Sequence, residues 1–320
     1  MPEATQSAIY RSGSVMQQVN VKPNSPSTPS FLRCPVCRSS PLLAVGEDGL
    51  ACPHGHRFAL RAGITMFAQD NAFDSHWDEF GDAHLPSTKL RAALRFMQPL
   101  LDGIPTENRF RLLDAGCGNG VHAAALCADF CGEDRQYVGI DLSVSALVAT
   151  QRVAPPGSLF FQGDIAKLPF EDGTFDAVLS YGVIAYTPDP QAVLREFARI
   201  LRPGGVLAVW VYPRRDGIGS ALFDVIRLLA RLGGPRGAAL LANSIVPFLG
   251  LLPTESGLNL CNASWKQCRE IVMVNIAPTT LHFPTATQLC GWLEAAGLMV
   301  EVEDHEHPLT LYASRSFQKG

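Results

Sequence analysis

The 320-residue sequence lacks the features that would place it in a membrane or on a polyanion. It has no run of 18 or more apolar residues, so no membrane span is expected. The polar, Pro/Ser-rich stretch 1–30 has no apolar centre of the kind that a signal peptide needs, and we therefore expect a cytoplasmic protein. The formal net charge of −4 supplies no overall positive field, which disfavours a nucleic-acid partner unless a local basic patch holds it.

Disulfide staples are not expected either, because 320 residues with 47% hydrophobic side chains suffice for an apolar core. Three of the nine cysteines instead gather at Cys34, Cys37 and Cys52. The pairs Cys34-x-x-Cys37 and Cys52-x-x-x-His56 have the spacing of a closed tetrahedral Zn²⁺ site. His54 is the competing fourth ligand, and the longer spacing favours His56. A segment this small is expected to depend on its metal.

Composition and hydrophobic periodicity divide the chain into segments with different expected structures. Short β-like runs alternate with amphipathic stretches from Arg109 onward, which predicts an α/β fold with a doubly wound parallel sheet. The expected segments are a flexible tail (1–30), a zinc ribbon (31–69), a linker with a lid helix (70–108), a central core (109–213), a helical cap insertion (214–284) and a C-terminal helix with strands that complete the core (285–320).

Helix starts are marked by capping residues. Ser87 precedes an apolar stretch with helical spacing, and Asp189 is followed by Pro190 in a first helical turn. A further helix is expected to begin at Ser143. Thr285 is followed three residues later by a glutamine, the pattern of a capping box. These signals predict four helices that alternate with the strands.

The segment 112–120, Leu-Leu-Asp-Ala-Gly-Cys-Gly-Asn-Gly, predicts a strand, a glycine turn and a helix. Gly116, Gly118 and Gly120 would let a ligand approach the backbone closely at a helix N-terminus. Their spacing differs from the G-x-G-x-x-G pattern of dinucleotide sites, and Asp114 before them would repel a pyrophosphate. An acid there suits a cation, such as the sulfonium and ammonium groups of S-adenosylmethionine.

With these residues in place, the sequence resembles the class I S-adenosylmethionine-dependent methyltransferases over about one hundred residues. The resemblance implies a Rossmann-like sheet that binds S-adenosylmethionine. It implies that Asp141, which ends the second strand, accepts the ribose hydroxyls, and that Asp164, after the third strand, takes the adenine amino group. Ile165 and Ser180 complete the expected cofactor contacts.

The cysteine segment has resemblances of its own. It is similar to the zinc ribbon that precedes many bacterial class I methyltransferases. It also resembles the N-terminal zinc module of the bacterial rRNA guanine-N1 methyltransferases, which share the Cys52-x-x-x-His56-x-Phe58 half. The linker Asp70–Asp82 is acidic, which weakens this second resemblance. A 23S rRNA guanine-N1 methyltransferase is therefore the alternative function.

The loop after the fourth expected strand, residues 180–187, is where this family places groups that face the methyl acceptor. It lacks the Asn/Asp-Pro-Pro-aromatic pattern of enzymes that methylate nucleobase amino groups, and the chain has no Pro-Cys nucleophile. Tyr181, Tyr186 and His76 are the candidate catalytic residues, and no general base is assigned. Methyl transfer is an in-line displacement, so proximity and desolvation can supply most of the catalysis.

The stretch Ile218–Leu252 is rich in leucine and other apolar residues, and we expect two helices there. They would cover the carboxyl edge of the sheet with Leu222, Phe223, Leu241 and Phe248. The alternatives are ordinary core or a homodimer interface, with membrane contact a lesser one. The sequence thus predicts a methyltransferase acting on a small or lipophilic metabolite. A non-catalytic scaffold that keeps the cofactor fold is the second alternative, and the intact acids of the expected cofactor site count against it.

Overall fold

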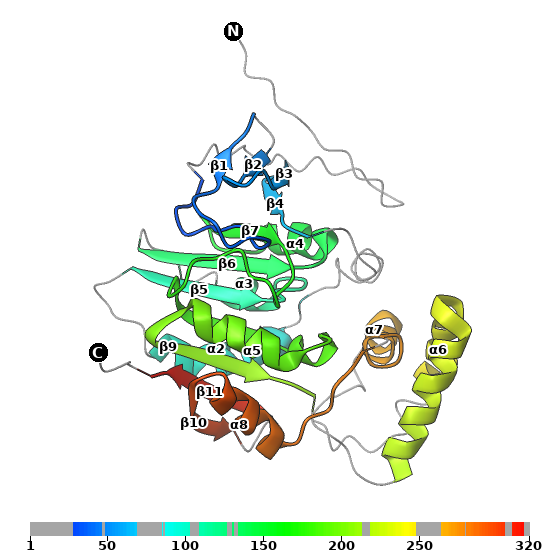
Figure 1. The fold of residues 1–320 in the computed structure, drawn as a ribbon. Helices are drawn as coiled ribbons and strands as arrows, with labels where there is room; N and C mark the ends of the chain where they lie inside the picture. The colour runs from blue at the N-terminus through cyan, green and yellow to red at the C-terminus, as the bar shows by residue number, and fades with distance from the viewer. Residues whose placement is uncertain are drawn as a thin grey trace.

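The computed structural model describes residues 28–46, 49–68, 85, 87–102, 109–126, 130, 134–212, 218–247, 264–278, 280–304 and 309–316. Most of the expected tail, the candidate His76 and most of the linker 70–108 lie outside these residues. An 11-stranded sheet runs through the molecule in the order β1-β2-β3-β4-β7-β6-β5-β8-β9-β11-β10, with helices on both faces (Figure 1).

Five parallel strands form the centre of this sheet. They are β5 (Phe110–Ala115), β6 (Arg135–Asp141), β7 (Leu159–Gln162), β8 (Phe175–Tyr181) and β9 (Leu201–Trp210). Two antiparallel strands, β11 (Thr310–Arg315) and β10 (Leu298–Asp304), follow at the edge beyond β9. The predicted α/β class with a doubly wound, Rossmann-like sheet is therefore confirmed.

Helices cover the two faces and create one apolar core on each. The helices α2 (Ser87–Asp102), α3 (Val121–Leu126) and α4 (Val144–Gln151) pack on one face, where their side chains surround Leu112 and Tyr137. The helices α5 (Pro190–Ile200) and α8 (Ala286–Ala295) pack on the other. Because helices cover both faces, nearly every side chain of β5 and β8 is buried.

The expected capping residues begin three of these helices. Asp189 accepts a 3.0 Å hydrogen bond from the backbone N–H of Ala192, directly before α5. Ser143 caps α4 in the same way, and Thr285 forms the predicted capping box with Gln288 at α8. These local predictions are confirmed because caps depend on residues close in sequence.

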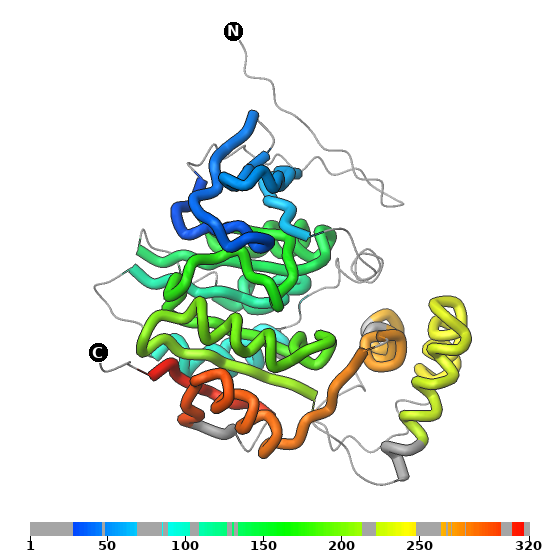
Figure 2. Tube along the Cα trace, in the orientation of Figure 1, coloured from blue at the N-terminus to red at the C-terminus, as the bar shows by residue number. Residues whose placement is uncertain are grey.

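The cysteine-containing ribbon continues the main sheet. Its strands β1 (Leu43–Ala44), β2 (Gly49–Ala51), β3 (Arg57–Arg61) and β4 (Ile64–Met66) form an antiparallel meander. The last of them, β4, pairs in parallel with β7, opposite Phe161 and Gln162. Figure 2 shows the ribbon in blue beside β7, at one edge of the set of central strands.

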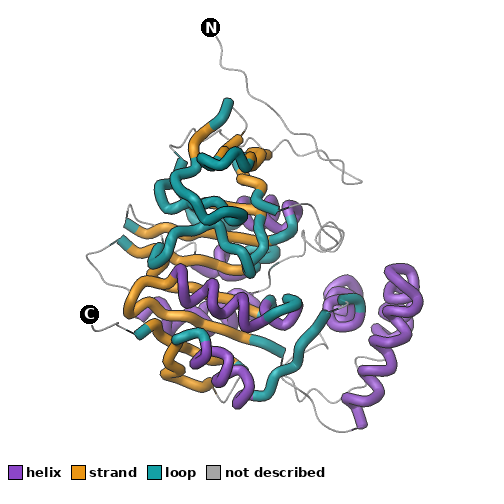
Figure 3. Tube along the Cα trace, viewed as in Figure 1, coloured by secondary structure: helices purple, strands orange, loops and turns teal. Residues whose placement is uncertain are grey.

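The insertion forms a helical layer that stands apart from the sheet (Figure 3). The helix α6 (Ile218–Ile245) bends at Gly234, where φ is 60°, directly before Pro235. It packs against α7 (Trp265–Ile276) around a small apolar core of its own. Leu222, one of the residues expected to cover the acceptor, is 61% exposed, and Phe248 lies outside the described residues. Within the described ranges, no helix is long and apolar enough to cross a membrane.

Candidate functional site

The glycine loop follows β5 at the carboxyl edge of the sheet. Gly116, Gly118 and Gly120 have φ values of 86°, 53° and 78°, in the left-handed region that residues other than glycine rarely adopt. A Cβ atom on Gly116 would lie 2.4 Å from Cγ2 of Val183, in the turn after β8. Glycine at position 116 is therefore required by both its backbone conformation and its close packing against Val183.

Asp114 is buried next to this loop, with 1% of its surface exposed. Its Oδ2 accepts a 2.7 Å hydrogen bond from the phenol of Tyr137 and lies 3.6 Å from Nδ1 of His122. Burial and the nearby Asp114 charge raise the pKa of Tyr137 well above its usual range, which keeps the phenol protonated as a donor. Oδ1 is buried and has no hydrogen-bond partner among the described residues. A buried carboxylate oxygen without a partner costs free energy, and a hydrogen-bond donor or a cation placed next to it would offset that cost.

The other two acids follow the next strands of the sheet. Asp141, at the end of β6, accepts hydrogen bonds from the backbone N–H groups of Gly118 (3.0 Å) and Ser143 (2.9 Å). Asp164, after β7, accepts a 2.9 Å hydrogen bond from the N–H of Ala166. A backbone hydrogen bond of 2.9 Å from Gly163 to the carbonyl of Asp141 joins the two turns. The structure thus brings the three predicted acids to one edge of the sheet.

The two remaining predicted cofactor residues lie close to the same edge, with buried side chains. Ile165 directly follows Asp164 and packs into the core on the α5 side. Ser180 is fully buried near the end of β8, and its hydroxyl donates to the carbonyl of Ala115 over 3.3 Å. Ser180 is therefore tied to the backbone that leads into the glycine loop, and Ile165 anchors the turn that carries Asp164 to the core.

Aromatic side chains line the neighbouring part of this edge. Tyr181 ends β8, is 41% exposed, and stacks on Trp210 with ring centroids 4.5 Å apart and an interplanar angle of 11°. Trp210 contacts Tyr212 at 4.6 Å, and Tyr212 contacts Tyr186 at 6.0 Å. Our sequence analysis missed Trp210 and Tyr212, although two aromatic residues at alternate positions near the end of β9 indicate one lined face.

The candidate tyrosines are protonated at neutral pH. Burial raises the pKa of Tyr181 to about 12, and burial raises the pKa of Tyr186 well above its usual range. The hydroxyl of Tyr186 donates to the carbonyl of Val274 over 3.0 Å, which ties α7 to the short turn η1 (Ile184–Tyr186). Both phenols can donate hydrogen bonds or orient a ligand, but neither is prepared to accept a proton.

The four expected metal ligands come together in the ribbon. The sulfur atoms of Cys34, Cys37 and Cys52 and a ring nitrogen of His56 all lie within 4.8 Å of one another. Cys37 Sγ is 3.7 Å from Cys52 Sγ, and His56 Nδ1 is 3.6 Å from Cys34 Sγ. Zinc bonds of about 2.3 Å to sulfur and about 2.0 Å to nitrogen would place tetrahedral ligand atoms about 3.5 to 3.8 Å apart. The competing His54 has its Nδ1 3.5 Å from Cys37 Sγ but is not part of this four-residue cluster.

The thiols in this cluster differ in their tendency to ionise. Burial raises the pKa of Cys34 to about 11, whereas hydrogen bonds from the side chain and backbone of Ser39 lower the pKa of Cys37 to about 5. The hydrogen bond to Cys52 raises the pKa of His56. A bound cation would favour the thiolate at each cysteine and the neutral ring at the histidine.

Charged side chains attach the ribbon to the core. Arg38 donates two hydrogen bonds to Glu196 on α5, of 3.0 and 2.9 Å, and Arg33 lies 2.7 Å from Asp172. These are two of the arginines that make the ribbon sequence mildly basic. Both arginines form ion pairs with carboxylates of the core.

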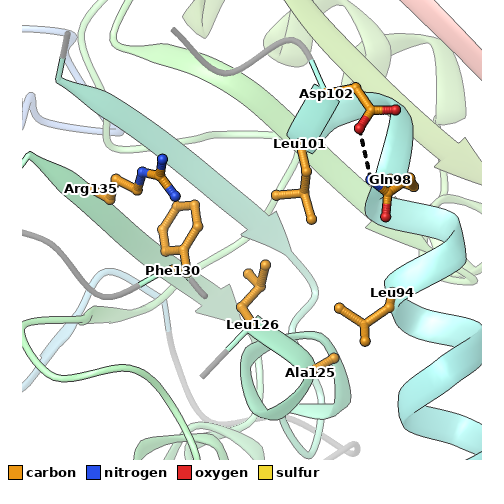
Figure 4. Close-up of a pocket in the computed structure, with 8 residues that line it drawn as sticks. All are labelled: Leu94, Gln98, Leu101, Asp102, Ala125, Leu126, Phe130 and Arg135. Carbon is orange, nitrogen blue, oxygen red and sulfur yellow. Dashed lines mark hydrogen bonds between the residues drawn. The ribbon is translucent and has the colours of Figure 1, made fainter. Parts of the chain in front are cut away.

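A separate groove lies between α2 and α3 (Figure 4). Its volume is about 340 Å³, and the side chains that line it are Leu94, Gln98, Leu101, Asp102, Ala125, Leu126, Phe130 and Arg135. Arg135 begins β6, whereas Asp141 ends it, so the groove lies at the amino edge of the sheet, away from the glycine loop. The one hydrogen bond drawn there joins Gln98 to Asp102 over 2.7 Å, and nothing in the groove suggests catalysis.

A parallel sheet ordered β7-β6-β5-β8-β9, with a glycine loop after β5 and carboxylates after β6 and β7, defines the Rossmann-like fold of class I S-adenosylmethionine-dependent methyltransferases. Residues 113–209 match the family model described as "Methyltransferase domain", and this part of the chain is a methyltransferase domain.

Two curated relatives and one solved structure illustrate the similarity. The chain is 34% identical over 197 residues to "Putative 23S rRNA (guanine-N(1)-)-methyltransferase YxjB" of Bacillus subtilis, which covers 58% of this chain and 66% of that protein. It is 32% identical over 146 residues to 27-O-demethylrifamycin SV methyltransferase of Amycolatopsis mediterranei, covering 44% and 50%. The chain thus spans 50% to 66% of the length of these relatives. A solved structure described as a complex between "the Haloferax volcanii Trm112 methyltransferase activator and the putative methyltransferase" has a TM-score of 0.47 at 17% identity, covering 78% of this chain and 100% of that one.

Proposed function

We propose that this protein transfers a methyl group from S-adenosylmethionine to a small-molecule acceptor with an apolar body. One observation carries the proposal: the buried Asp114 has a carboxylate oxygen without a partner among the described residues, directly beside the glycine loop. A positively charged ligand would supply the missing interaction. A pyrophosphate would bring two like charges to the same place, which disfavours a dinucleotide.

Each predicted residue has a defined part in holding the cofactor. Asp114 would face the positively charged end of S-adenosylmethionine, and Gly116 and Gly118 would let the cofactor approach the backbone. Asp141, already held by the N–H of Gly118, would accept its ribose hydroxyls. Asp164 would accept the adenine amino group. When bound, S-adenosylmethionine supplies a methyl group made electrophilic by its sulfonium centre.

The chain's own contribution to the reaction would be binding, orientation and exclusion of water. The aromatic side chains near the ends of β8 and β9, including the stacked pair Tyr181 and Trp210, offer an apolar surface to an acceptor beside the glycine loop. The Tyr181 phenol is protonated at neutral pH and would orient the acceptor through a hydrogen bond. An acceptor that attacks without a protein base fits this surface, because an in-line displacement gains most from proximity and desolvation.

The cysteine cluster would hold one structural Zn²⁺. Cys34, Cys37, Cys52 and His56 supply four protein ligands with mutual distances that suit a tetrahedral ion. Four protein ligands close the coordination shell, so the ion would stabilise the ribbon and leave no open position for catalysis.

An rRNA methyltransferase is the second candidate, and the relative from Bacillus subtilis favours it. The charge distribution favours a small molecule. The net charge of the chain is −4, and Arg33 and Arg38 of the ribbon are paired with core carboxylates. That leaves Arg57 and Arg61 on β3 as the ribbon arginines exposed for contact with phosphates. A scaffold without catalysis is disfavoured by the three acids that the fold brings to one edge.

Isothermal titration calorimetry with S-adenosylmethionine tests the cofactor assignment. The wild-type protein should bind one equivalent, and Asp141→Ala should weaken binding by roughly 2 to 3 kcal/mol, the order lost with a charge-assisted hydrogen-bonding group. Asp102→Ala, at the opposite edge of the sheet, is the matched control and should bind like wild type. Binding of NADH in place of S-adenosylmethionine, or equal affinity in the Asp141 variant, would refute the assignment.

A further inference from the structure

Arg227, on α6, is a buried cation that the cofactor site does not use. It is 6% exposed, and its Nη2 donates a 3.2 Å hydrogen bond to the carbonyl of Pro278. Its Nε is buried without a hydrogen-bond partner, and none of the ion pairs among the described residues includes Arg227. Burial lowers the pKa of Arg227, with Arg231 acting in the same direction and Asp224 opposing it.

His282 supplies a second buried nitrogen without a partner. Its Nε2 makes no hydrogen bond within the described part of the chain. Its backbone N–H donates to the carbonyl of Ala185 over 2.8 Å, which places His282 beside η1, the turn that follows β8. The next residue, Phe283, lies under Arg227, with the guanidinium carbon 5.8 Å from the ring centroid. Arg227 therefore contacts the segment that carries His282, through Pro278 and Phe283.

This region adjoins the aromatic side of the candidate acceptor site. The phenol of Tyr186, in η1, is close enough to Arg227 for the arginine charge to act on its pKa. From Tyr186 the ring contacts continue through Tyr212 and Trp210 to Tyr181. An acceptor lying along these rings would have one end beside the glycine loop and the other beside Arg227.

A surface cavity adjoins the buried Arg227. Arg227 lines this cavity of about 250 Å³ together with Asp224, Leu228 and Arg231, all on one side of α6. Two arginines and one aspartate give this cavity a net positive charge. Buried cations in proteins are normally paired or bound to a ligand, because an isolated charge is costly to remove from water.

We propose that Arg227 and His282 bind an anionic group, a carboxylate or a phosphate monoester, at one end of the methyl acceptor. The proposal rests on the proposed methyltransferase function and narrows its substrate class to molecules with an apolar body and an anionic terminus. The guanidinium would form charge-assisted hydrogen bonds to the anion, and the His282 ring would donate a further one.

Calorimetric titration of the full chain, saturated with S-adenosylhomocysteine, tests this with three probes of similar shape. Phenylacetate and phenyl phosphate carry the two anionic groups, and benzyl alcohol is neutral. We expect at least one anionic probe to bind about 10-fold or more tightly than benzyl alcohol. The stronger of the two identifies the group as a carboxylate or a phosphate. Equal binding of all three probes, or no binding of either anion, would overturn the proposal.

Variants of Arg227 separate anion binding from a structural role. Arg227→Met should weaken the anionic probe about 10-fold or more and leave benzyl alcohol unchanged, while Arg227→Lys should retain part of the affinity. Arg236→Met removes an exposed arginine from the same helix and should change nothing. If Arg227 instead serves only to hold Pro278, Arg227→Met would lower the melting temperature without a probe-specific loss, and that result would refute the proposal.

Affinity for S-adenosylhomocysteine distinguishes a failure of the anion site from a failure of the proposed methyltransferase function. It should be the same in wild type, Arg227→Met, Arg227→Lys and His282→Gln. A chain that binds S-adenosylhomocysteine but no anionic probe would retain the proposed methyltransferase function and lose the anion site. A chain that does not bind S-adenosylhomocysteine would contradict the methyltransferase proposal itself.

Discussion

Arg38 of the ribbon and Glu196 of α5 form a two-point ion pair, with nitrogen–oxygen distances of 3.0 and 2.9 Å. The same carboxylate accepts a 3.0 Å hydrogen bond from the backbone N–H of Leu168 and a 2.9 Å hydrogen bond from Arg199. Leu168 lies four positions after Asp164. One buried carboxylate thus joins the ribbon, a core helix and the segment that carries a predicted cofactor residue.

Replacing this carboxylate should destabilise the protein. Glu196→Gln removes the charge that Arg38 and Arg199 share, and breaking such a partly buried network costs on the order of 1 to 3 kcal/mol. Urea unfolding gives the free energy difference. Glu294→Gln, on the exposed side of α8, is the control and should be neutral. Equal stability of the two variants would mean that the network contributes nothing.

The same network predicts a dependence on pH. Burial alone would raise the pKa of Glu196, but hydrogen bonds from Arg199 and Arg38 outweigh it and hold the pKa below its ordinary value. A pKa lowered by folding adds stability that is present above the unfolded value, about 4.3, and is lost as the pH falls through the folded value. The unfolding free energy of wild type should therefore fall on acidification below about pH 4.3.

The Glu196→Gln variant should lose less stability over the same pH range. Asp172, whose pKa burial alone would raise but which hydrogen bonding to Arg199 lowers, keeps a residual dependence in the variant. Urea unfolding at pH 3 to 6 measures both slopes. Parallel curves would show that Glu196 has the same pKa in the folded and unfolded chains.

Gly116 should tolerate no side chain. In Gly116→Ala the new Cβ would lie 2.4 Å from Cγ2 of Val183 at a φ of 86°, so both a clash and backbone strain are expected. Gly157 has a φ of 80° and open space around its Cβ position, and Gly157→Ala therefore measures the strain alone, about 1 kcal/mol. Thermal unfolding should show a larger loss for Gly116→Ala.

A double variant identifies the contact that causes this loss. Val183→Ala combined with Gly116→Ala removes the two methyl groups that the new Cβ would meet and should restore part of the stability. S-adenosylmethionine affinity should recover less than stability, because the added methyl group still occupies the loop. Complete recovery of both would show that the loop does not contact the cofactor.

The features that could be predicted from the sequence are those that depend on neighbouring residues. The cap at Asp189 and the capping box at Thr285 follow from local hydrogen bonding and hydrophobic periodicity, and the structure has them where expected. The order of motifs after successive strands likewise placed Asp114, Asp141 and Asp164 at one edge, because the carboxyl ends of parallel strands meet there.

The features that escaped prediction depend on pairing between distant segments. Nothing in the sequence around Thr65 indicates that β4 would pair with β7, because a short apolar strand has many compatible partners. The ion pair between Arg38 and Glu196 spans 158 positions. Helical periodicity likewise cannot tell which apolar side chains of α6 face a neighbour: Leu222 is 61% exposed, whereas Phe223 packs against the core that α6 shares with α7.

Zinc should copurify at one ion per chain and should depend on His56. Cys34→Ser with Cys37→Ser should remove the metal and lower the melting temperature, because binding free energy in a ribbon is folding free energy. Cys34 and Cys52 belong to the same apolar core as the central strands, so the loss should extend to the sheet. His56→Ala should lose zinc, whereas His54→Ala, the matched control, should keep it. Elemental analysis decides, and metal retained without His56 would contradict the ligand set.

Salt dependence separates a small-molecule acceptor from rRNA. A protein that binds RNA must neutralise several phosphates, and its affinity then falls steeply as salt displaces those contacts. An apolar acceptor held by the rings of Tyr181 and Trp210 gains mainly from burial, at about 25 cal/mol per Å², which depends little on salt. We expect no specific binding of an rRNA fragment in fluorescence titrations between about 50 and 200 mM salt. Micromolar binding that falls about 100-fold over this range, and that Arg57→Gln with Arg61→Gln abolishes, would instead establish the ribbon as an RNA-binding surface.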